Sequence, residues 1–229
     1  MIEQTKEQRM YYRIRNLCGL LGMILPWLAL FSAGIADHPN DQWWWSISAT
    51  YYLSPALVGV LVPSSIVLIS YIGYDDYDAW ITSLSGIFGL CIVLFPCKVS
   101  WIPEGTPVGF FQIPIQISHI IHTCSAALFF ILISINSLFL FTKHGAVQTP
   151  QKKIRNIVYK VCGWGMIGLL IVFLSLHLIG VPKFFVMIIE ILLLSLFGLS
   201  WLVKGGAFPF LNDKEVDDND NDVPVLIER

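Results

Sequence analysis

Residues 184–203 read FFVMIIEILLLSLFGLSWLV, an apolar stretch with a single charged side chain, Glu190. A helix rises 1.5 Å per residue, so roughly 20 apolar residues are enough to cross the hydrocarbon core of a bilayer. The stretch therefore predicts a transmembrane helix, within which Glu190 is an exception that needs an explanation.

Five further stretches of the same kind precede it in the chain, and the one at 79–96 is the shortest of the six. They are Leu17–Ile35, Pro55–Tyr74, Ala79–Pro96, Pro114–Phe141 and Val158–Gly180. None alternates apolar and polar residues over its whole length, so a transmembrane barrel is not expected. Lipid offers the backbone no hydrogen bonds, and each segment must satisfy its own as a helix. The predicted fold is an all-α membrane protein, a bundle of six transmembrane helices.

Composition supports this class of protein. Of the 229 residues, 55% are hydrophobic and 13% are charged, whereas a soluble domain has about 25% charged residues. This excludes an ordinary soluble enzyme, a nucleic-acid-binding protein and a disordered chain. We expect a basic N-terminus (residues 1–15), a membrane domain (16–205) and an acidic, disordered tail (206–229).

The charges also predict the orientation. With six spans both termini lie on one side, and that side has 12 Lys and Arg residues whereas the other has Lys98 and Lys183. Basic loops stay in the cytoplasm, so we expect a protein of the plasma (bacterial inner) membrane with both termini cytoplasmic. The first span also resembles a signal peptide ending near Gly34–Ala36, but its removal would leave five spans and break this charge alternation.

Four titratable side chains lie inside predicted spans, where polar groups are expensive and often functional. His119 and His122 are three residues apart on one predicted helix. His177 and Glu190 are expected at similar depth on two neighbouring helices, which a short connection joins. From the helical rise, all four are expected within about 12 Å of the outer ends of their helices.

Three roles are possible for these four side chains. Three imidazoles and a carboxylate could bind zinc, although no His-x-x-x-His motif is present. The same groups could form a proton relay for a transporter. In the third alternative they have only a packing role, in which Glu190 is protonated or paired with His177. Apart from the zinc alternative, no cofactor is expected.

The first outer loop adds further candidates beside a run of three tryptophans at residues 43–45. They are Asp37, Asp41, Ser48, Tyr51 and Tyr52. Indole rings favour the membrane boundary, and this loop could hold a lipid or another amphipathic molecule, or simply anchor the protein there.

Pairs of glycines recur at helical spacing on single faces, which allows helices to approach closely in lipid. They are Gly19 and Gly22, Gly86 and Gly89, and Gly165 and Gly168. We expect all three pairs to lie at helix–helix contacts.

Three segments together resemble a group of small bacterial multi-pass membrane proteins of unknown function. They are Ile47–Tyr52 leading to Val58–Gly59, Tyr71–Asp75 followed by Leu94–Pro96, and Ala126–Phe130 through Ser137–Thr142. The resemblance covers residues 16–205 and implies a six-helix membrane fold without an activity.

A weaker similarity connects the chain with intramembrane zinc amide hydrolases related to alkaline ceramidases. It rests on Ser48, on Asp37 or Asp41, and on the three histidines, but the late His-x-x-x-His motif of that family and its seventh span are missing. The sequence therefore leaves enzymatic activity undecided. The leading expectation is an outer-half polar pocket, formed by these residues and Glu190, that binds a lipid-like or small amphipathic molecule. A metal-dependent lipid or amide hydrolase and a proton-coupled transporter are the alternatives.

Overall fold

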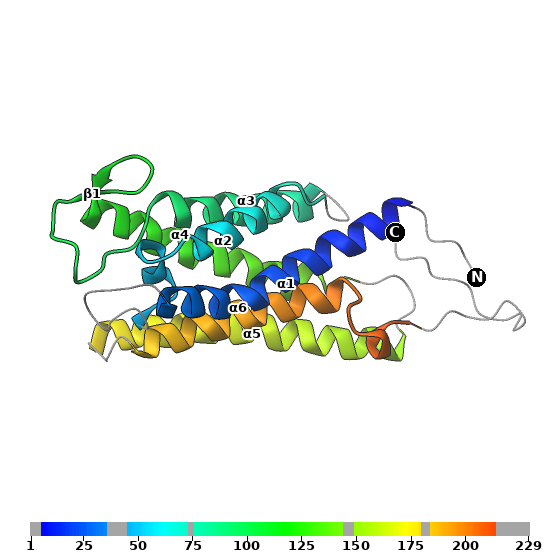
Figure 1. Ribbon diagram of the computed structural model, residues 1–229. Helices are drawn as coiled ribbons and strands as arrows, with labels where there is room; N and C mark the ends of the chain where they lie inside the picture. Colours follow the sequence, from blue (N-terminus) through cyan, green and yellow to red (C-terminus); the bar gives the residue numbers. More distant parts are fainter. Residues whose placement is uncertain (1–5, 36–44, 73–75, 144–148, 180–183, 214–229) are drawn as a thin grey trace, which may run out of the picture.

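The computed structural model describes residues 6–35, 45–72, 76–143, 149–179 and 184–213. These ranges contain six α-helices that lie side by side along one axis (Figure 1). The helices are α1 (Lys6–Ile35), α2 (Ala56–Ile69), α3 (Asp76–Leu94), α4 (Ile115–Ile135), α5 (Pro150–Ile179) and α6 (Phe184–Lys204). The shorter elements are the 3₁₀ turns η2 (Ser48–Tyr52) and η4 (Pro209–Leu211), the π-helical turn η3 (Asn136–Leu140), and the strands β1 (Pro107–Val108) and β2 (Ile113–Pro114).

Five of the described helices are long and apolar enough to cross a membrane: α1, α3, α4 continued by η3, α5 and α6. This confirms the all-α, multi-pass membrane class. The sixth crossing expected from the second apolar stretch is not confirmed, because α2 has only 14 residues and a length of about 21 Å. The helix of the third stretch, α3, has 19 residues, so the second helix is the shortest.

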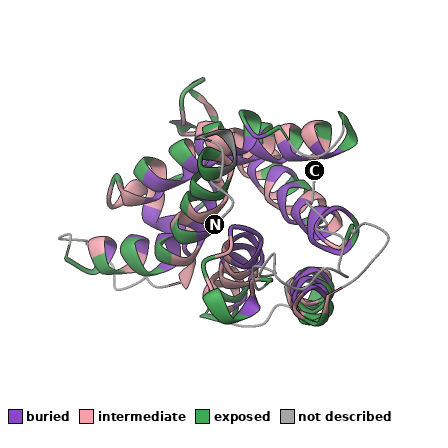
Figure 2. Ribbon diagram, turned by 90° about the vertical axis from the view of Figure 1, so that its right-hand side faces the viewer, coloured by how far each residue is buried: buried purple, intermediate pink, exposed green. Residues whose placement is uncertain are grey.

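The helices form a closed ring in chain order. Each packs against its neighbours in sequence, and α6 returns to pack along α1. Inside the ring, Phe129 of α4 and Phe197 of α6 meet with ring centroids 5.7 Å apart. Figure 2 shows the buried faces turned toward one another and the exposed faces turned outward. The outward faces carry large apolar side chains such as Phe31, 70% exposed, and Ile171, 61% exposed, as expected for helices surrounded by lipid.

Close helix contacts occur where the glycines predicted them, with one exception. A Cβ atom on Gly19 would lie 2.6 Å from the backbone nitrogen of Leu202, and one on Gly86 would lie 2.5 Å from the carbonyl oxygen of Ser65. Gly168 has no such neighbour within 4 Å. The prediction for Gly168 was therefore wrong, because that face of α5 is open.

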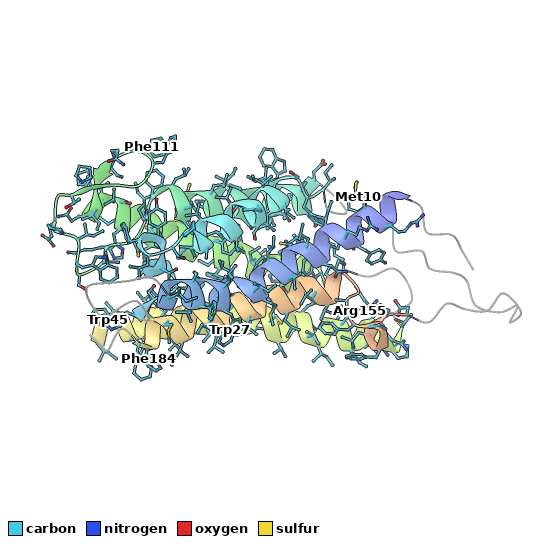
Figure 3. All side chains as sticks on the ribbon, in the orientation of Figure 1. Met10, Trp27, Trp45, Phe111, Arg155 and Phe184 are labelled. Atoms are coloured by element: carbon cyan, nitrogen blue, oxygen red, sulfur yellow. The ribbon has the colours of Figure 1, made fainter. Side chains whose placement is uncertain are left out.

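The two ends of the bundle differ in character. We call the end where α1 and α5 begin and α6 finishes the basic end, and the end with η2, the β1–β2 hairpin and the start of α6 the hairpin end (Figure 1). Helices α1 and α5 have 30 residues each, about 45 Å, which exceeds the hydrocarbon core of about 30 Å. Figure 3 labels Met10 and Arg155 at the basic end, and Trp45 and Phe184 at the hairpin end.

Candidate functional sites

Glu190 in α6 binds the segment that leads into η2. The Ser48 hydroxyl donates to Oε1 at 2.8 Å, and the Ile47 backbone N–H donates to Oε2 at 2.5 Å. The Ser46 hydroxyl lies 3.0 and 2.8 Å from the two oxygens. A carboxylate offers about four lone-pair sites, and three donors from one short segment occupy them here.

These contacts bring non-helical backbone to membrane depth. Glu190 is six residues past Phe184, the first residue of α6, so residues 46–48 lie about 9 Å inside the end of that helix. Irregular backbone is tolerated at such depth only where its polar groups are satisfied by protein. Glu190 satisfies the Ile47 N–H, and the Ser48 N–H bonds to Ser46 Oγ at 3.1 Å. The segment that leads into η2 is thus held against α6 by its own polar groups and by Glu190.

The polar layer at this end continues from η2 to α3 and α4. The Tyr52 hydroxyl donates to the carbonyl oxygen of Cys97 at 2.8 Å, and Ser118 Oγ donates to that of Pro96 at 2.8 Å. His122 Nδ1 lies 3.0 Å from the Ile92 carbonyl oxygen and 2.9 Å from that of Phe95. Because both partners are acceptors, Nδ1 of His122 has the proton.

The structure brings some of the predicted site residues together. Glu190 and Ser48, 142 positions apart in sequence, are in direct contact. Tyr51 and Tyr52 are on the same 3₁₀ turn, with ring centroids 5.1 Å apart, and His119 and His122 are on α4. Asp37, Asp41 and the side chain of His177 lie outside the described residues.

In the part of the chain that the structure describes, no group of three or more His, Cys, Asp and Glu side chains lies close enough to hold a metal ion. The contacts given above join Glu190 to residues 46–48 and His122 to the end of α3. A zinc site made of His119, His122, His177 and Glu190 therefore has no support from the described side chains.

A second polar site, which the sequence did not predict, lies at the basic end. Three cationic side chains are buried there: Lys152 is 3% exposed, Arg155 is 8% exposed and Lys204 is 6% exposed. Lys152 Nζ donates to the carbonyl oxygen of Phe141 at 3.2 Å, and Lys204 Nζ lies 5.5 Å from the centre of the Phe141 ring. Cations from α5 and α6 thus meet at the end of the α4–η3 helix.

Arg155 connects this cluster to the segment after α6. Its Nη1 donates to the Leu211 carbonyl oxygen at 2.6 Å, and its Nη2 lies 2.8 Å from Asp213 Oδ2. Thr149 also donates a short hydrogen bond to Asp213. Burial alone would raise the pKa of Asp213, but the hydrogen bonds from Thr149 and Arg155 and the nearby positive charges hold it below its ordinary value.

Polar groups from the other helices reach the same end. Asp78 of α3, 4% exposed, pairs with Lys143 at 2.8 Å, and Arg15 of α1 donates from Nε to the Tyr71 hydroxyl at 3.0 Å. Asn136 opens the π-helical turn η3 and donates to Thr82 Oγ1 at 3.2 Å. Short π-helical turns are frequent at functional sites.

Cations outnumber carboxylates among the side chains that the structure describes at the basic end. Nine Lys and Arg side chains lie there against three Asp and Glu side chains. The excess of cations remains even if every carboxylate there forms an ion pair. Such a cluster attracts anions, most strongly where the cations are shielded from water.

Sequence reasoning missed this site because it assigned these charges to loops. Helix α5 begins at Pro150, so Lys152, Arg155 and Asn156 are helical residues at spacings of three and four, on one face. That spacing was a signal in the sequence. Burial of Lys204 and Asp78 depends on contacts between distant helices and had no comparable local signal.

The chain was also compared with known proteins. It matches no protein-family model, and no curated protein or solved structure was found to resemble it.

Proposed function

We propose that this chain is a six-span integral membrane protein of the plasma membrane that binds an anionic, lipid-like molecule through the cationic cluster of its basic end. The observation that supports this function is the burial of Lys152, Arg155 and Lys204 together, where α4, α5 and α6 meet. Three cations gathered in one place and shielded from water create a local positive potential that attracts an anion. A phosphate group, with several acceptor oxygens, suits such a cluster.

The position of the cluster favours a membrane lipid as the source of the phosphate. Lys204 is the last residue of α6, and Phe141 follows η3 at the end of the α4 span. The cluster therefore lies where hydrocarbon gives way to headgroups, at the depth of lipid phosphates. Basic pockets between transmembrane helices on the cytoplasmic side are common sites for anionic headgroups.

The orientation follows from the same charges. Positive loops stay in the cytoplasm, so the basic end is the cytoplasmic end and both termini lie there. In this arrangement α2 and the segment 46–52 together make the second of six crossings, with Glu190 supporting the non-helical part.

The outer-half pocket expected from the sequence stays a prediction. Its central group, Glu190, accepts hydrogen bonds from Ser46, Ile47 and Ser48, which favours an anchoring role over contact with a ligand. A metal-dependent hydrolase and a proton-coupled transporter gain no specific support from the described residues.

Binding should be measured with the full chain in nanodiscs or detergent. The probes are an anionic phospholipid, a zwitterionic phospholipid with the same acyl chains, and inorganic phosphate. The anionic lipid is expected to bind more tightly than the zwitterionic one, and the difference should shrink at high salt. Each cation near a membrane surface contributes about 1 kcal/mol, so Lys152→Gln or Lys204→Gln should weaken anionic-lipid binding about fivefold.

Lys153→Gln is the matched control, because it removes the same charge from the same helix turn at an exposed position. Equal affinity for the anionic and zwitterionic lipids, or an equal effect of the three variants, contradicts the proposal. Competition by inorganic phosphate at the lipid's own concentration would identify a soluble phosphate compound as the ligand and contradict the lipid assignment.

A further inference from the structure

The loop between α3 and α4 presents two aromatic side chains at the tip of the β1–β2 hairpin. Phe110 is 75% exposed and Phe111 is 53% exposed. The surrounding sequence is apolar or uncharged, since residues 105–142 contain no Asp, Glu, Lys or Arg. An aqueous loop of this kind normally carries charges, whereas the lipid-facing surface of α4, which follows directly, does not.

The hairpin tip is fixed to the end of α3. Phe110 N–H donates to the carbonyl oxygen of Leu94, the last residue of α3, at 3.2 Å. The ring of Phe111 stacks on that of Phe95, with centroids 5.2 Å apart and planes 20° apart. Gly109 permits this approach: it has φ 72°, and a Cβ atom there would lie 2.5 Å from the Leu94 oxygen.

These contacts determine the depth of the tip. The Phe95 carbonyl oxygen accepts a hydrogen bond from His122, which is seven residues into α4, about 10 Å from its first residue. Figure 3 shows Phe111 on the outside of the bundle, next to the helices. The tip therefore lies alongside α4 and not beyond its end.

The depth of the hairpin tip in the bilayer can be calculated from the length of the α4 span. The span Ile115–Leu140 has 26 residues, about 39 Å, so about 4–5 Å extends beyond each side of a 30 Å hydrocarbon core. The two phenylalanines, about 10 Å from the start of α4, then lie about 5 Å below the hydrocarbon boundary.

The backbone of the tip is suited to that environment. Besides the bond from Phe110 to Leu94, Gln112 N–H and Gln112 Nε2 both donate to the Gly109 carbonyl oxygen, at 3.4 and 2.7 Å. Non-helical backbone needs such internal partners near lipid. An exposed hydrophobic pair on a rigid hairpin marks an interaction surface.

We propose that Phe110 and Phe111 form an aromatic wedge that inserts into the lipid leaflet at the hairpin end. The occupant of this surface is the acyl-chain region just below the headgroups. The wedge holds the loop between α3 and α4 against the bilayer, and it does not depend on the function proposed for the basic end.

The test is a spin-label measurement on the full chain in lipid vesicles. A nitroxide is attached at Phe111→Cys, and separately at Phe110→Cys, whose ring does not stack on Phe95. Cys91 and Cys124, which are not buried, are first replaced by Ser. Collision rates are then compared for oxygen, which partitions into lipid, and for a water-soluble nickel complex.

Two positions calibrate the reading: Glu104→Cys in the same loop, whose side chain is 69% exposed and charged, and Ile120→Cys on α4, 63% exposed. At Phe110 and Phe111 the oxygen-to-nickel ratio is expected to be several-fold above that at Glu104 and close to that at Ile120. Ratios at both phenylalanines that match Glu104 place the tip in water and overturn the proposal. Loss of oxygen access together with nickel access would indicate a protein partner, and would overturn it as well.

Discussion

Glu190 shows how one charged residue can serve the fold of a membrane protein. Its carboxylate binds three donors of residues 46–48, including a backbone N–H that lipid could not satisfy. An unpaired buried donor destabilises a fold by about 1–3 kcal/mol. Glu190 avoids this destabilisation because it accepts the hydrogen bond of the Ile47 N–H. A residue that looked like a catalytic or transport group in the sequence is explained by the backbone that it supports.

Two substitutions of Glu190 should therefore behave differently. Glu190→Gln keeps an acceptor for the Ile47 N–H, and its amide can donate to the two serine hydroxyls, so we expect a small change in unfolding temperature. Glu190→Leu leaves the donors unpaired and should lower the unfolding temperature in detergent by several degrees, about 1–3 kcal/mol. A leucine variant as stable as the wild type would contradict the anchoring role.

We expect Asp213 to make the stability of the protein depend on pH in the acid range. Its pKa is lowered in the folded protein, so its contact with Arg155 stabilises the fold fully above the unfolded Asp value and is lost as pH falls through the lowered folded value. The stability difference between wild type and Asp213→Asn should be constant above about pH 5 and decrease between about pH 5 and pH 2. Thermal unfolding of both proteins across this range measures it; a constant difference at all pH values would exclude a role for this carboxylate.

At the scale of elements, close helix contacts depend on particular glycines. A Cβ atom on Gly86 would overlap the carbonyl oxygen of Ser65, a backbone atom that cannot rotate away, whereas Gly168 faces open space. Gly86→Ala should destabilise the α2–α3 contact by about 1–3 kcal/mol, as expected for overpacking. Gly168→Ala, the matched control, should be neutral or slightly stabilising because alanine favours the helix. Unfolding in mixed detergent micelles compares the two variants, and equal effects would show that the α2–α3 approach is not tight.

At the scale of the whole molecule, the number of crossings decides which side each terminus faces. If α2 and the segment 46–52 complete a span, the chain crosses six times and both termini are cytoplasmic. If α2 does not cross, the count is five and the termini lie on opposite sides. Reporters fused separately to the N- and C-terminus should both give the cytoplasmic signal, with a label at Lys98 as the control for the opposite side. Opposite signals from the two termini would exclude six crossings.

The fold class was predictable because lipid imposes a simple rule. Apolar stretches such as Phe184–Val203 have to be helical, and glycine spacing indicated the contacts of Gly19 and Gly86. The short length of α2 could not be predicted in the same way. Hydropathy detects the apolar stretch at 55–74 but not where its helix ends, and Glu190, from the far end of the sequence, binds residues 46–48 in a neighbouring segment that is not α-helical.

The sequence by itself determined that this is a helical membrane protein, because hydrophobicity acts through local composition. Only the tertiary structure decided what the polar residues do. The pairing of Ser48 with Glu190 and the burial of Lys152, Arg155 and Lys204 around Phe141 arise from contacts between segments far apart in the chain. Whether a charge is exposed, paired or buried depends on those contacts, and local composition does not record them.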